Sequence, residues 1–368
     1  MRPARSAALR GRLLEWYRVA RRDLPWRRTG DPYAIWVSEV MLQQTQVATV
    51  VPFYLRFLER FPTLEALAAA SEDEVMACWT GLGYYRRAKN MLRAAREVVE
   101  RHGGKLPGTF EELARLPGIG PYTAAAVASI AFRRPHAVLD GNVARVLCRV
   151  EAFAGDDRTP SNRAALQELA DRLLVPEAPG DFNQAMMELG ATVCLPTGPA
   201  CPSCPLARVC RARRHGPPEQ YPRRAPRRKS VAVDWTVLLA IRRGRVLLVR
   251  SATPGLYAGM WELPWVEGVP GALACRDEHG GPHVPGSAAG LASALAAKYG
   301  LSLGEARPLA ALRHAVTVRR IRLHAVEGTV TGAGRRGAQT ARWVPLPELN
   351  AYGLSSMASK VLSAWMRR

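Results

Sequence analysis

The sequence contains no apolar run long enough to cross a membrane. The longest run, from Ala124 to Phe132, falls short of the ~20 residues that a spanning helix needs, and it contains the polar Ser129. The first residues are basic, but the apolar core of a secretory signal does not follow them. We therefore expect a soluble, cytoplasmic protein with no membrane partner.

Lysine is scarce in this basic chain. Among the 52 Lys and Arg residues, the lysines are only Lys89, Lys105, Lys229, Lys298 and Lys360. Reactions that need an amine nucleophile therefore have few candidate residues. Against 31 acidic residues, the basic ones give a formal net charge of +21, which both halves of the chain share. This charge favours a polyanionic partner such as nucleic acid, although a solvated basic surface would explain it equally well.

The length of 368 residues predicts two or three domains. Residues 1–211 show helical patterns without strand-like alternation, so we predict an all-α domain. Asp31-Pro32 marks one helix start, and that helix is predicted to run to about Ala48. Residues 231–368 hold strand-like segments at 231–241, 245–249, 319–330 and 342–344 and helical ones at 288–299 and 355–366, which predicts an α+β domain.

Residues 212–230, between these two regions, combine four prolines with a run of arginines. Such a composition cannot build a core and predicts an extended basic linker. The linker is either a tether that lies along nucleic acid or only a solvated spacer.

Four of the seven cysteines fall within 17 residues: Cys194, Cys201, Cys204 and Cys210. In a reducing cytoplasm, a metal site explains this cluster better than a disulfide framework. One close pair flanked by longer spacings is typical of four thiolates around a [4Fe–4S] cluster, whereas zinc sites usually show two close pairs. We therefore expect an iron–sulfur loop at 194–210 that shapes a basic surface.

A glycine-rich turn, Leu116 to Gly120 (LPGIG), lies between two helical segments. Gly118 and Gly120 permit a tight turn and a close approach of the backbone to a ligand. Amides at the start of the next helix then point toward an anion. The pattern is typical of a helix-hairpin-helix DNA-binding element, with an ordinary turn between packed helices as the alternative.

The hairpin, the segment Val138 to Val143 (VLDGNV) and the cysteine spacing together resemble the helix-hairpin-helix-GPD superfamily of DNA glycosylases over about residues 5–211. Its cluster-bearing members include endonuclease III-type and MutY-type enzymes. Endonuclease III-type enzymes place a Schiff-base lysine two residues after the last glycine of the hairpin. Here that position is Tyr122, as in many MutY-type enzymes, and the missing amine argues against a lyase.

The segment from Ser38 to Val47 (SEVMLQQTQV) closely resembles the MutY-type family. On a continuous helix, Glu39, Gln43 and Gln46 would share one polar face beside an apolar one. A polar stripe against an apolar wall suits a pocket for a flipped purine. An ordinary amphipathic helix with Glu39 in solvent would show the same pattern.

The resemblance also implies residues that contact the base or the DNA. The adenine pocket would be lined by Trp26, Arg27, Leu42, Val47 and Gln184, and Glu188 lies one helical turn beyond Gln184 in the same motif. Residues that wedge into the duplex where the adenine leaves would be Gln44 and Tyr84, and residues near the opposing lesion would be Thr45 and Leu82. Plain core packing is the alternative for each aromatic or aliphatic member.

Excision of adenine needs an acid that protonates the departing base and an anion that stabilises the cationic sugar. Glu39 on its apolar wall fits the acid, acting at N7, because burial keeps a carboxyl protonated near neutral pH. Asp140 precedes a helix start, which favours negative charge, and fits the anion that stabilises or briefly traps the oxocarbenium ion. Tyr122 and Asn142 would orient water or the sugar. A plain helix cap is the alternative for Asp140.

The segment Gly259 to Pro264 (GMWELP), after two strand-like segments, resembles a Nudix-like domain. Residues 288–300 lack the paired glutamates that hold Mg²⁺ in a working Nudix hydrolase, so we expect no hydrolase activity. The domain instead resembles the module with which MutY-type enzymes read 8-oxoguanine. That module often carries a Phe-Ser-His loop after an Arg-His pair. Here Thr317, after Arg313-His314, replaces the serine hydroxyl or is simply a strand residue, and the histidine is absent.

Together, these motifs predict a two-part protein: an all-α glycosylase domain with its [4Fe–4S] loop, followed by an α+β Nudix-like domain. The predicted activity is monofunctional excision of adenine from double-stranded DNA that carries adenine opposite 8-oxoguanine or guanine, by a monomer associated with the nucleoid. An endonuclease III-type pyrimidine glycosylase and lyase is disfavoured by Tyr122 and by the additional domain. A non-catalytic DNA-binding protein is disfavoured by the joint presence of Glu39 and Asp140.

Overall fold

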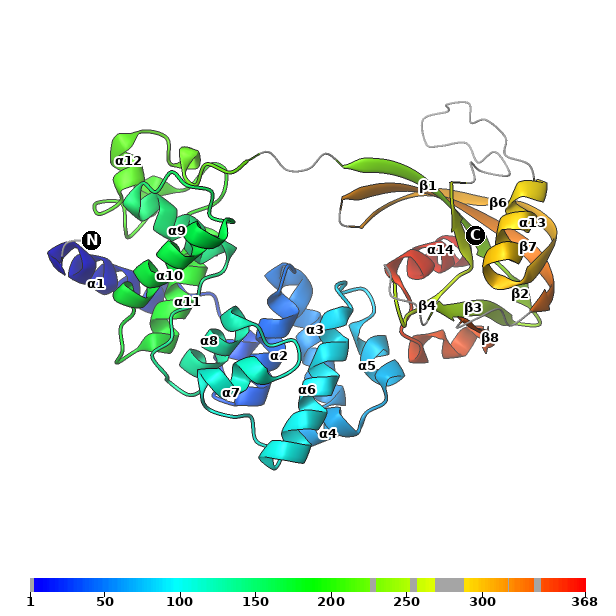
Figure 1. The fold of residues 1–368 in the computed structure, drawn as a ribbon, viewed down its shortest axis with the longest axis horizontal. Coiled ribbons are helices and arrows are strands. Elements are labelled where there is room, and N and C mark those ends of the chain that lie inside the picture. Colours follow the sequence, from blue (N-terminus) through cyan, green and yellow to red (C-terminus); the bar gives the residue numbers. More distant parts are fainter. Residues whose placement is uncertain (1–2, 226–229, 252–256, 269–287, 317, 334–338) are drawn as a thin grey trace. The chain divides into compact units, whose positions relative to one another are not determined.

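The computed structural model describes residues 3–225, 230–251, 257–268, 288–316, 318–333 and 339–368. The contacts between residues divide the chain into two compact units, whose elements are labelled in Figure 1. Unit 1 contains Met1–Ala69 and Asn90–Pro226, and unit 2 contains Ala70–Lys89 and Arg227–Arg368. Residues 70–89, which the sequence analysis groups with the helical domain, thus pack with C-terminal residues.

Unit 1 is helical, as predicted. Its helices are α1 (Pro3–Ala20), α2 (Pro32–Leu42), α3 (Val47–Arg60), α4 (Leu64–Ala69), most of α6 (Arg86–His102), α7 (Phe110–Arg115), α8 (Pro121–Ile130), α9 (Gly141–Glu151), α10 (Pro160–Leu173), α11 (Pro179–Thr192) and α12 (Arg211–His215). Short 3-10 turns occupy Pro25–Arg27, Cys201–Ser203 and Pro218–Gln220. In the part of the chain that the structure describes, no helix is long and apolar enough to cross a membrane.

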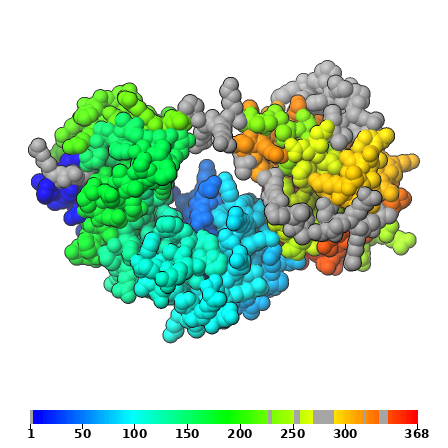
Figure 2. Space-filling model, viewed as in Figure 1, coloured from blue at the N-terminus to red at the C-terminus, as the bar shows by residue number. Residues whose placement is uncertain are grey.

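Helix α2 begins at a capped proline, as the sequence predicts. The carboxylate of Asp31 accepts hydrogen bonds from the amides of Tyr33 at 3.1 Å and Ala34 at 3.2 Å. All residues from Tyr33 to Met41 are buried. In α8, every residue from Thr123 to Ser129 is buried, and its alanines allow the neighbouring helices to approach closely. Side chains fill the gaps that the ribbons of Figure 1 leave between helices (Figure 2).

The prediction that α2 continues to about Ala48 was wrong. The helix ends at Leu42, Gln43 leaves the helical region with a ψ of 111°, and α3 starts at Val47. Gln44 has a φ of 57°, in the left-handed region that few non-glycine residues adopt. Four polar residues, Gln43 to Gln46, span this break, but Val40 and Val47 keep the seven-residue spacing of one continuous helix face, so periodicity alone does not reveal it.

The predicted linker is largely part of unit 1, and the prediction of an extended chain was wrong for residues 212–225. Arg149 donates to the backbone carbonyl of Pro218 at 3.0 Å. Arg224 donates two hydrogen bonds, of 2.7 and 2.6 Å, to the buried carboxylate of Asp157. These partners lie more than 60 positions earlier in the chain, so local composition does not disclose them. Residues 226–229 lie outside the described residues.

Unit 2 is α+β, as predicted. Its elements are α5 (Glu72–Trp79), β1 (Val231–Leu239), β2 (Ile241–Arg242), β3 (Arg245–Ser251), β4 (Trp261–Glu262), β5 (Trp265–Glu267), α13 (Ala288–Tyr299), β6 (Leu301–Val316), β7 (Arg319–Ala333), β8 (Gln339–Pro345), a 3-10 turn at Leu346–Ala351 and α14 (Ser356–Met366). One sheet has the order β5-β1-β7-β6, and the other has β2-β3-β4 with β8 paired to β3. Strands β1 and β7 run parallel, and the other strand pairs are antiparallel.

Strand β6 was missed by the sequence analysis. It pairs with β7 over nearly its whole length, and the register shifts three times along the way. Gly304 and Pro308 interrupt the alternation of apolar and polar residues, and both lie at these irregularities. The partner strand, rather than the local sequence of β6, defines this element.

The contact between α11 and the start of α9 leaves no space for a side chain at Gly190. A Cβ there would lie 2.6 Å from the Cβ of Asn142 and 3.1 Å from its backbone. We expect Gly190→Ala to lower the stability of the protein by about 1–3 kcal/mol, because overpacking must move the backbone. Thermal unfolding measures this effect. Gly11→Ala on α1 is the control, since nothing lies within 4 Å of its added methyl group. Equal unfolding midpoints of the two variants would contradict the close contact.

Candidate active site

Glu39 is buried between α2, α8 and α11. Its side chain is 5% exposed, and the hydroxyl of Tyr122 donates to its Oε2 at 2.8 Å. The same hydroxyl lies 3.1 Å from Met187 Sδ on α11. Burial raises the pKa of Glu39 to about 7, partly offset by the Tyr122 hydrogen bond, and the charge of Asp140 raises it further. A carboxyl with this pKa is protonated in about half of the molecules at neutral pH, so it can donate a proton there.

Asp140 is the N-cap of α9. Its Oδ1 accepts a hydrogen bond of 2.6 Å from the Val143 amide, and its Oδ2 accepts one of 3.2 Å from the side-chain amide of Asn142. Burial raises the pKa of Asp140, while these hydrogen bonds and Arg145 act in the opposite direction. Asp140 also raises the pKa of Glu39 and Tyr122 electrostatically, so the three groups are neighbours in one site.

Arg145, which the sequence analysis did not single out, supports Asn142. Its guanidinium donates to the side-chain oxygen of Asn142 at 2.8 Å and to the carbonyl of Gly190 at 2.7 Å. It also donates to the carbonyl of Cys194 at 2.8 Å. Its position three residues after Asn142 in α9 was the available signal, but the partners on other segments were not predictable.

Glu188 has no exposed side-chain surface and therefore presents nothing to a ligand. It accepts hydrogen bonds from Arg22 at 2.7 and 2.8 Å and from Arg27 at 2.8 Å. Burial alone would raise the pKa of Glu188, but these guanidinium groups lower it to about 2. The ion pair positions Arg27, whose guanidinium also lies 5.5 Å from the centre of the Tyr17 ring. Arg22 was not predicted.

The other predicted pocket residues vary in exposure. Trp26 is buried and packs edge-on against Tyr54 at 5.3 Å. Half-buried positions are held by Leu42, Val47 and Gln184, at the end of α2, the start of α3 and within α11. Val47 and Gln184 thus lie on helices that contact α2 and α8, respectively.

The break between α2 and α3 places two predicted DNA-contacting residues at a sharp turn. Gln44 is exposed in its left-handed conformation, and Thr45 is half-buried with its hydroxyl 3.4 Å from the carbonyl of Gln43. Gln43 donates to the hydroxyl of Thr123 at 3.0 Å, which anchors the turn to α8. The predicted polar face of Glu39, Gln43 and Gln46 therefore does not exist as one helical stripe.

The glycine turn joins α7 to α8, with Gly118 and Gly120 exposed and Leu116 and Ile119 buried. Gly118 has a φ of 78°, and an added Cβ would lie 2.5 Å from the Cβ of Asn90, so glycine is required there. Gly120 is the N-cap of α8, and nothing lies within 4 Å of a Cβ added to it. This open space beside the amides of a helix N-terminus suits a bound anion.

Leu82 and Tyr84 belong to unit 2, in the loop between α5 and α6. Leu82 is buried at 5% exposure, whereas Tyr84 is 51% exposed. Leu82 therefore contributes to the core in this structure, and Tyr84 presents its ring to the surface. Thr317 lies outside the described residues. His314, two strand positions before Val316, is buried and lies 2.7 Å from the hydroxyl of Tyr257.

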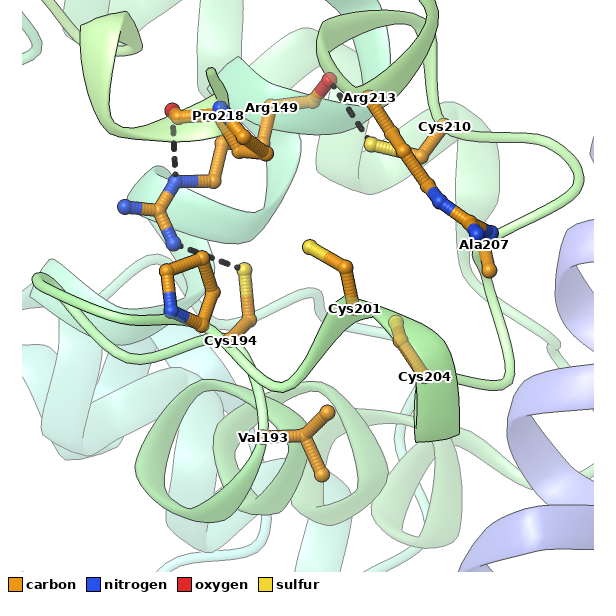
Figure 3. Close-up of a pocket in the computed structure, with 10 residues that line it drawn as sticks. Arg149, Val193, Cys194, Cys201, Cys204, Ala207, Cys210, Arg213 and Pro218 are labelled. Carbon is orange, nitrogen blue, oxygen red and sulfur yellow. Dashed lines mark hydrogen bonds between the residues drawn. The ribbon is translucent and has the colours of Figure 1, made fainter.

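The four clustered cysteines line one pocket, as Figure 3 shows. Arg149 and Arg213 line it as well, and its empty space is about 310 Å³, open solvent included. Arg149 donates to the sulfur of Cys194 at 3.3 Å, and the thiol of Cys210 lies 3.4 Å from the carbonyl of Arg149. Within the described residues, no three His, Cys, Asp or Glu side chains are arranged to hold a single metal ion.

The four sulfurs surround this space instead of meeting at one point (Figure 3). Burial raises the pKa of the Cys204 thiol to about 11, so thiolates form here only if a cation compensates them. A thiolate-bound group larger than one ion fits this donor set, and the flanking arginines fit its negative charge.

Two family models match the chain. The model described as HhH-GPD superfamily base excision DNA repair protein matches residues 37–172, and the NUDIX domain model matches residues 236–364.

Curated relatives are adenine DNA glycosylases. The protein of Homo sapiens is 43% identical over 317 residues, which cover 72% of this chain and 58% of the relative. That of Rattus norvegicus is 42% identical, covering 70% of this chain and 60% of the relative, and that of Arabidopsis thaliana is 39% identical, covering 69% and 46%. The chain thus spans about three fifths of the length of the mammalian relatives.

Solved structures match the helical part. A thermostable thymine-DNA glycosylase is 30% identical with a TM-score of 0.54, over 58% of this chain and 98% of that chain. An endonuclease III in a non-covalent complex with DNA covers the same shares at 23% identity and a TM-score of 0.51, which shows the fold alone.

The raised pKa of Glu39 predicts a pH-dependent contribution to stability. Because the folded state favours the protonated carboxyl, this contribution is complete below the ordinary value of 4.5 and is lost as pH rises through about 7. We expect Glu39→Gln, which stays neutral, to gain stability relative to the unsubstituted protein as pH rises from about 5 to about 8. Thermal unfolding followed by circular dichroism measures this difference. The exposed Glu59→Gln is the control, and a pH-independent difference for Glu39→Gln would refute the raised pKa.

Proposed function

Since the chain belongs to the HhH-GPD superfamily of base excision DNA repair proteins, we propose that it is a monofunctional adenine DNA glycosylase. It hydrolyses the N-glycosidic bond of adenine paired with 8-oxoguanine or guanine in double-stranded DNA. The adenine DNA glycosylases among its relatives support adenine as the excised base. The choice of 8-oxoguanine or guanine as the opposing base rests on the sequence resemblance.

The observation that carries the proposal is the pair of neighbouring carboxyl groups, the buried Glu39 and the half-buried Asp140, with the Tyr122 hydroxyl of α8 bonded to Glu39. Glycosidic cleavage uses one carboxyl as a proton donor and another as an anion, and different environments assign the two roles. Glu39, buried and with a pKa of about 7, is the donor. Asp140, held by two hydrogen-bond donors at a helix start, is the anion.

In the proposed reaction, adenine leaves the base stack and enters the pocket beside α2, at a cost of a few kcal/mol. Glu39 transfers its proton to N7, which makes the base a better leaving group. As the bond to the sugar breaks, Asp140 stabilises the positive charge that develops there. A water molecule, oriented by Tyr122 and Asn142, then bonds to the sugar carbon that the base has left. This water gives up a proton to Glu39.

In the proposed complex, exposed residues in the turns between helices contact the DNA. Gly118 and Gly120 present backbone amides to a phosphate, and the open space at Gly120 lets the strand approach. Gln44 and Tyr84, both exposed and left-handed, enter the duplex beside the vacated position. The net charge of +21 offsets the cost of distorting the DNA.

The pocket lined by Cys194, Cys201, Cys204 and Cys210 holds a [4Fe–4S] cluster in this proposal. Bonds from these four thiolates to the cluster would clip the loop between α11 and α12. Arg145 joins the carbonyl of Cys194 to Asn142, so the clipped loop supports the residues around Asp140. The NUDIX domain reads the lesion opposite the adenine, and the protein acts as a monomer in the cytoplasm at the nucleoid.

We expect the purified protein to excise adenine from a duplex with adenine opposite 8-oxoguanine, and from one with adenine opposite guanine. Strands break only after alkali, because no lysine occupies the position of Tyr122. Glu39→Gln should lower the single-turnover rate by at least about 100-fold, the scale of general acid catalysis, with DNA affinity retained. Gel electrophoresis of labelled strands measures excision. Strand breakage without alkali, borohydride trapping, or activity only on oxidised thymine would favour the pyrimidine lyase.

Iron analysis tests the cluster. We expect about four iron atoms per chain and a visible absorption band in the purified protein. Cys204→Ser should lose both, because the remaining three thiols do not complete the donor set. Cys78→Ser, a cysteine outside the pocket, is the matched control and should keep them. Zinc in place of iron, or full iron content in Cys204→Ser, would contradict this assignment.

A further inference from the structure

Tyr84 has an unusual combination of backbone and exposure. Its φ is 50°, in the left-handed region, and its side chain is 51% exposed. The preceding loop turns through Gly81, with a φ of 98°, and Gly83, with a φ of 77°. A large aromatic side chain in a left-handed conformation costs free energy, so contacts nearby must compensate for it.

Arg87 supplies those contacts. Its guanidinium lies 5.4 Å from the ring centre of Trp79 and 5.4 Å from that of Tyr84, so it joins a fully buried ring to an exposed one. It also donates to the carbonyl of Gly83 at 3.0 Å and, through Nε, to that of Tyr84 at 3.4 Å. Trp79 donates to the same Gly83 carbonyl at 3.1 Å. Trp79 and Arg87 therefore both bind the loop at Gly83, the residue that precedes Tyr84.

The location of Arg87 is electrostatically unfavourable for a cation. It is the second residue of α6, and the positive end of a helix dipole repels positive charge. Burial lowers the pKa of Arg87 to about 10, but the group stays charged at neutral pH. The loss of solvation and the helix dipole both disfavour the guanidinium at this position. The contacts with the two rings and the two carbonyls therefore keep it there. The adjacent Arg86 is exposed instead.

We propose that Arg87 is a positioning residue that fixes the ring of Tyr84 in the orientation that enters the DNA duplex. This inference rests on the proposed function, in which Tyr84 acts as a wedge. The guanidinium acts only through Tyr84. Its planar face packs against the Tyr84 ring and the buried Trp79 ring, and its hydrogen bonds to the carbonyls of Gly83 and Tyr84 stabilise the left-handed backbone. Lysine does not reproduce this contact, because an ammonium group has no planar face to lie between two rings.

A double-mutant cycle tests the proposal. In Arg87→Met we expect the dissociation constant for a duplex with an abasic analogue opposite 8-oxoguanine to rise about tenfold, the scale of a partly desolvated cation–π contact. In a Tyr84→Ala background, the same substitution should have almost no further effect. The matched control is Arg86→Met, which removes an equal charge one residue earlier and should show the same small effect in both backgrounds. In the background that keeps Tyr84, fluorescence of 2-aminopurine beside the lesion should lose the signal of ring insertion in Arg87→Met and keep it in Arg86→Met.

The possible outcomes separate this inference from its premise. If the unsubstituted protein does not excise adenine, the proposed function fails. If it does, and Arg87→Met weakens binding equally with and without Tyr84, the side chain is merely structural and the inference is overturned. Thermal unfolding identifies a variant that fails to fold. In that case Arg87→Lys replaces it in the same cycle, where loss of coupling to Tyr84 supports the inference and unchanged binding overturns it.

Discussion

A carboxyl group removed from water is the central constraint of the helical unit. Glu39 is tolerated there because Tyr122 satisfies one oxygen and because the protonated form avoids the cost of a buried charge. Asp140 lies close enough to favour that protonated form, while its own charge is favoured by a helix start. The packing of α2, α8 and α9 thus gives the two carboxyl groups different surroundings: Glu39 bonds to a tyrosine hydroxyl, and Asp140 accepts a backbone amide at a helix start. In the proposed reaction this difference becomes the division between acid and anion.

Helix α9 links this pair to the cysteine pocket. Asp140 caps its start, Arg145 reaches the carbonyl of Cys194 one turn later, and Arg149 reaches the sulfur of Cys194 after another. Because successive turns of one rigid helix carry these contacts, a displacement of the cysteine loop would be transmitted to the cap. This arrangement explains physically how a group bound far from the carboxyl pair would stabilise the site without taking part in the chemistry.

Many of the candidate site residues were identified from local sequence. Tyr122 in place of a lysine, the capping position of Asp140 and the cysteine spacing are features of consecutive residues, and the family matches agree with the resemblance they suggested. Tertiary partners were not predictable: the local sequence does not show that Arg22 binds Glu188 or that Arg145 binds the carbonyl of Cys194. Glu188 proved to be a buried counter-ion rather than an exposed contact. The linker was misjudged for the same reason, since Arg224 finds Asp157 far along the chain.

The sequence by itself determined the kinds of helices and strands, the reactive residue types and the superfamily, because periodicity, capping and motif spacing are short-range properties. Only the tertiary structure decided where α2 ends, how β6 pairs and which groups share a site. These depend on contacts between segments that are distant along the chain, where burial and electrostatic neighbours are established together. The pKa of Glu39 belongs to this second class: the residue is written in the sequence, but its proton affinity is a property of the packed site.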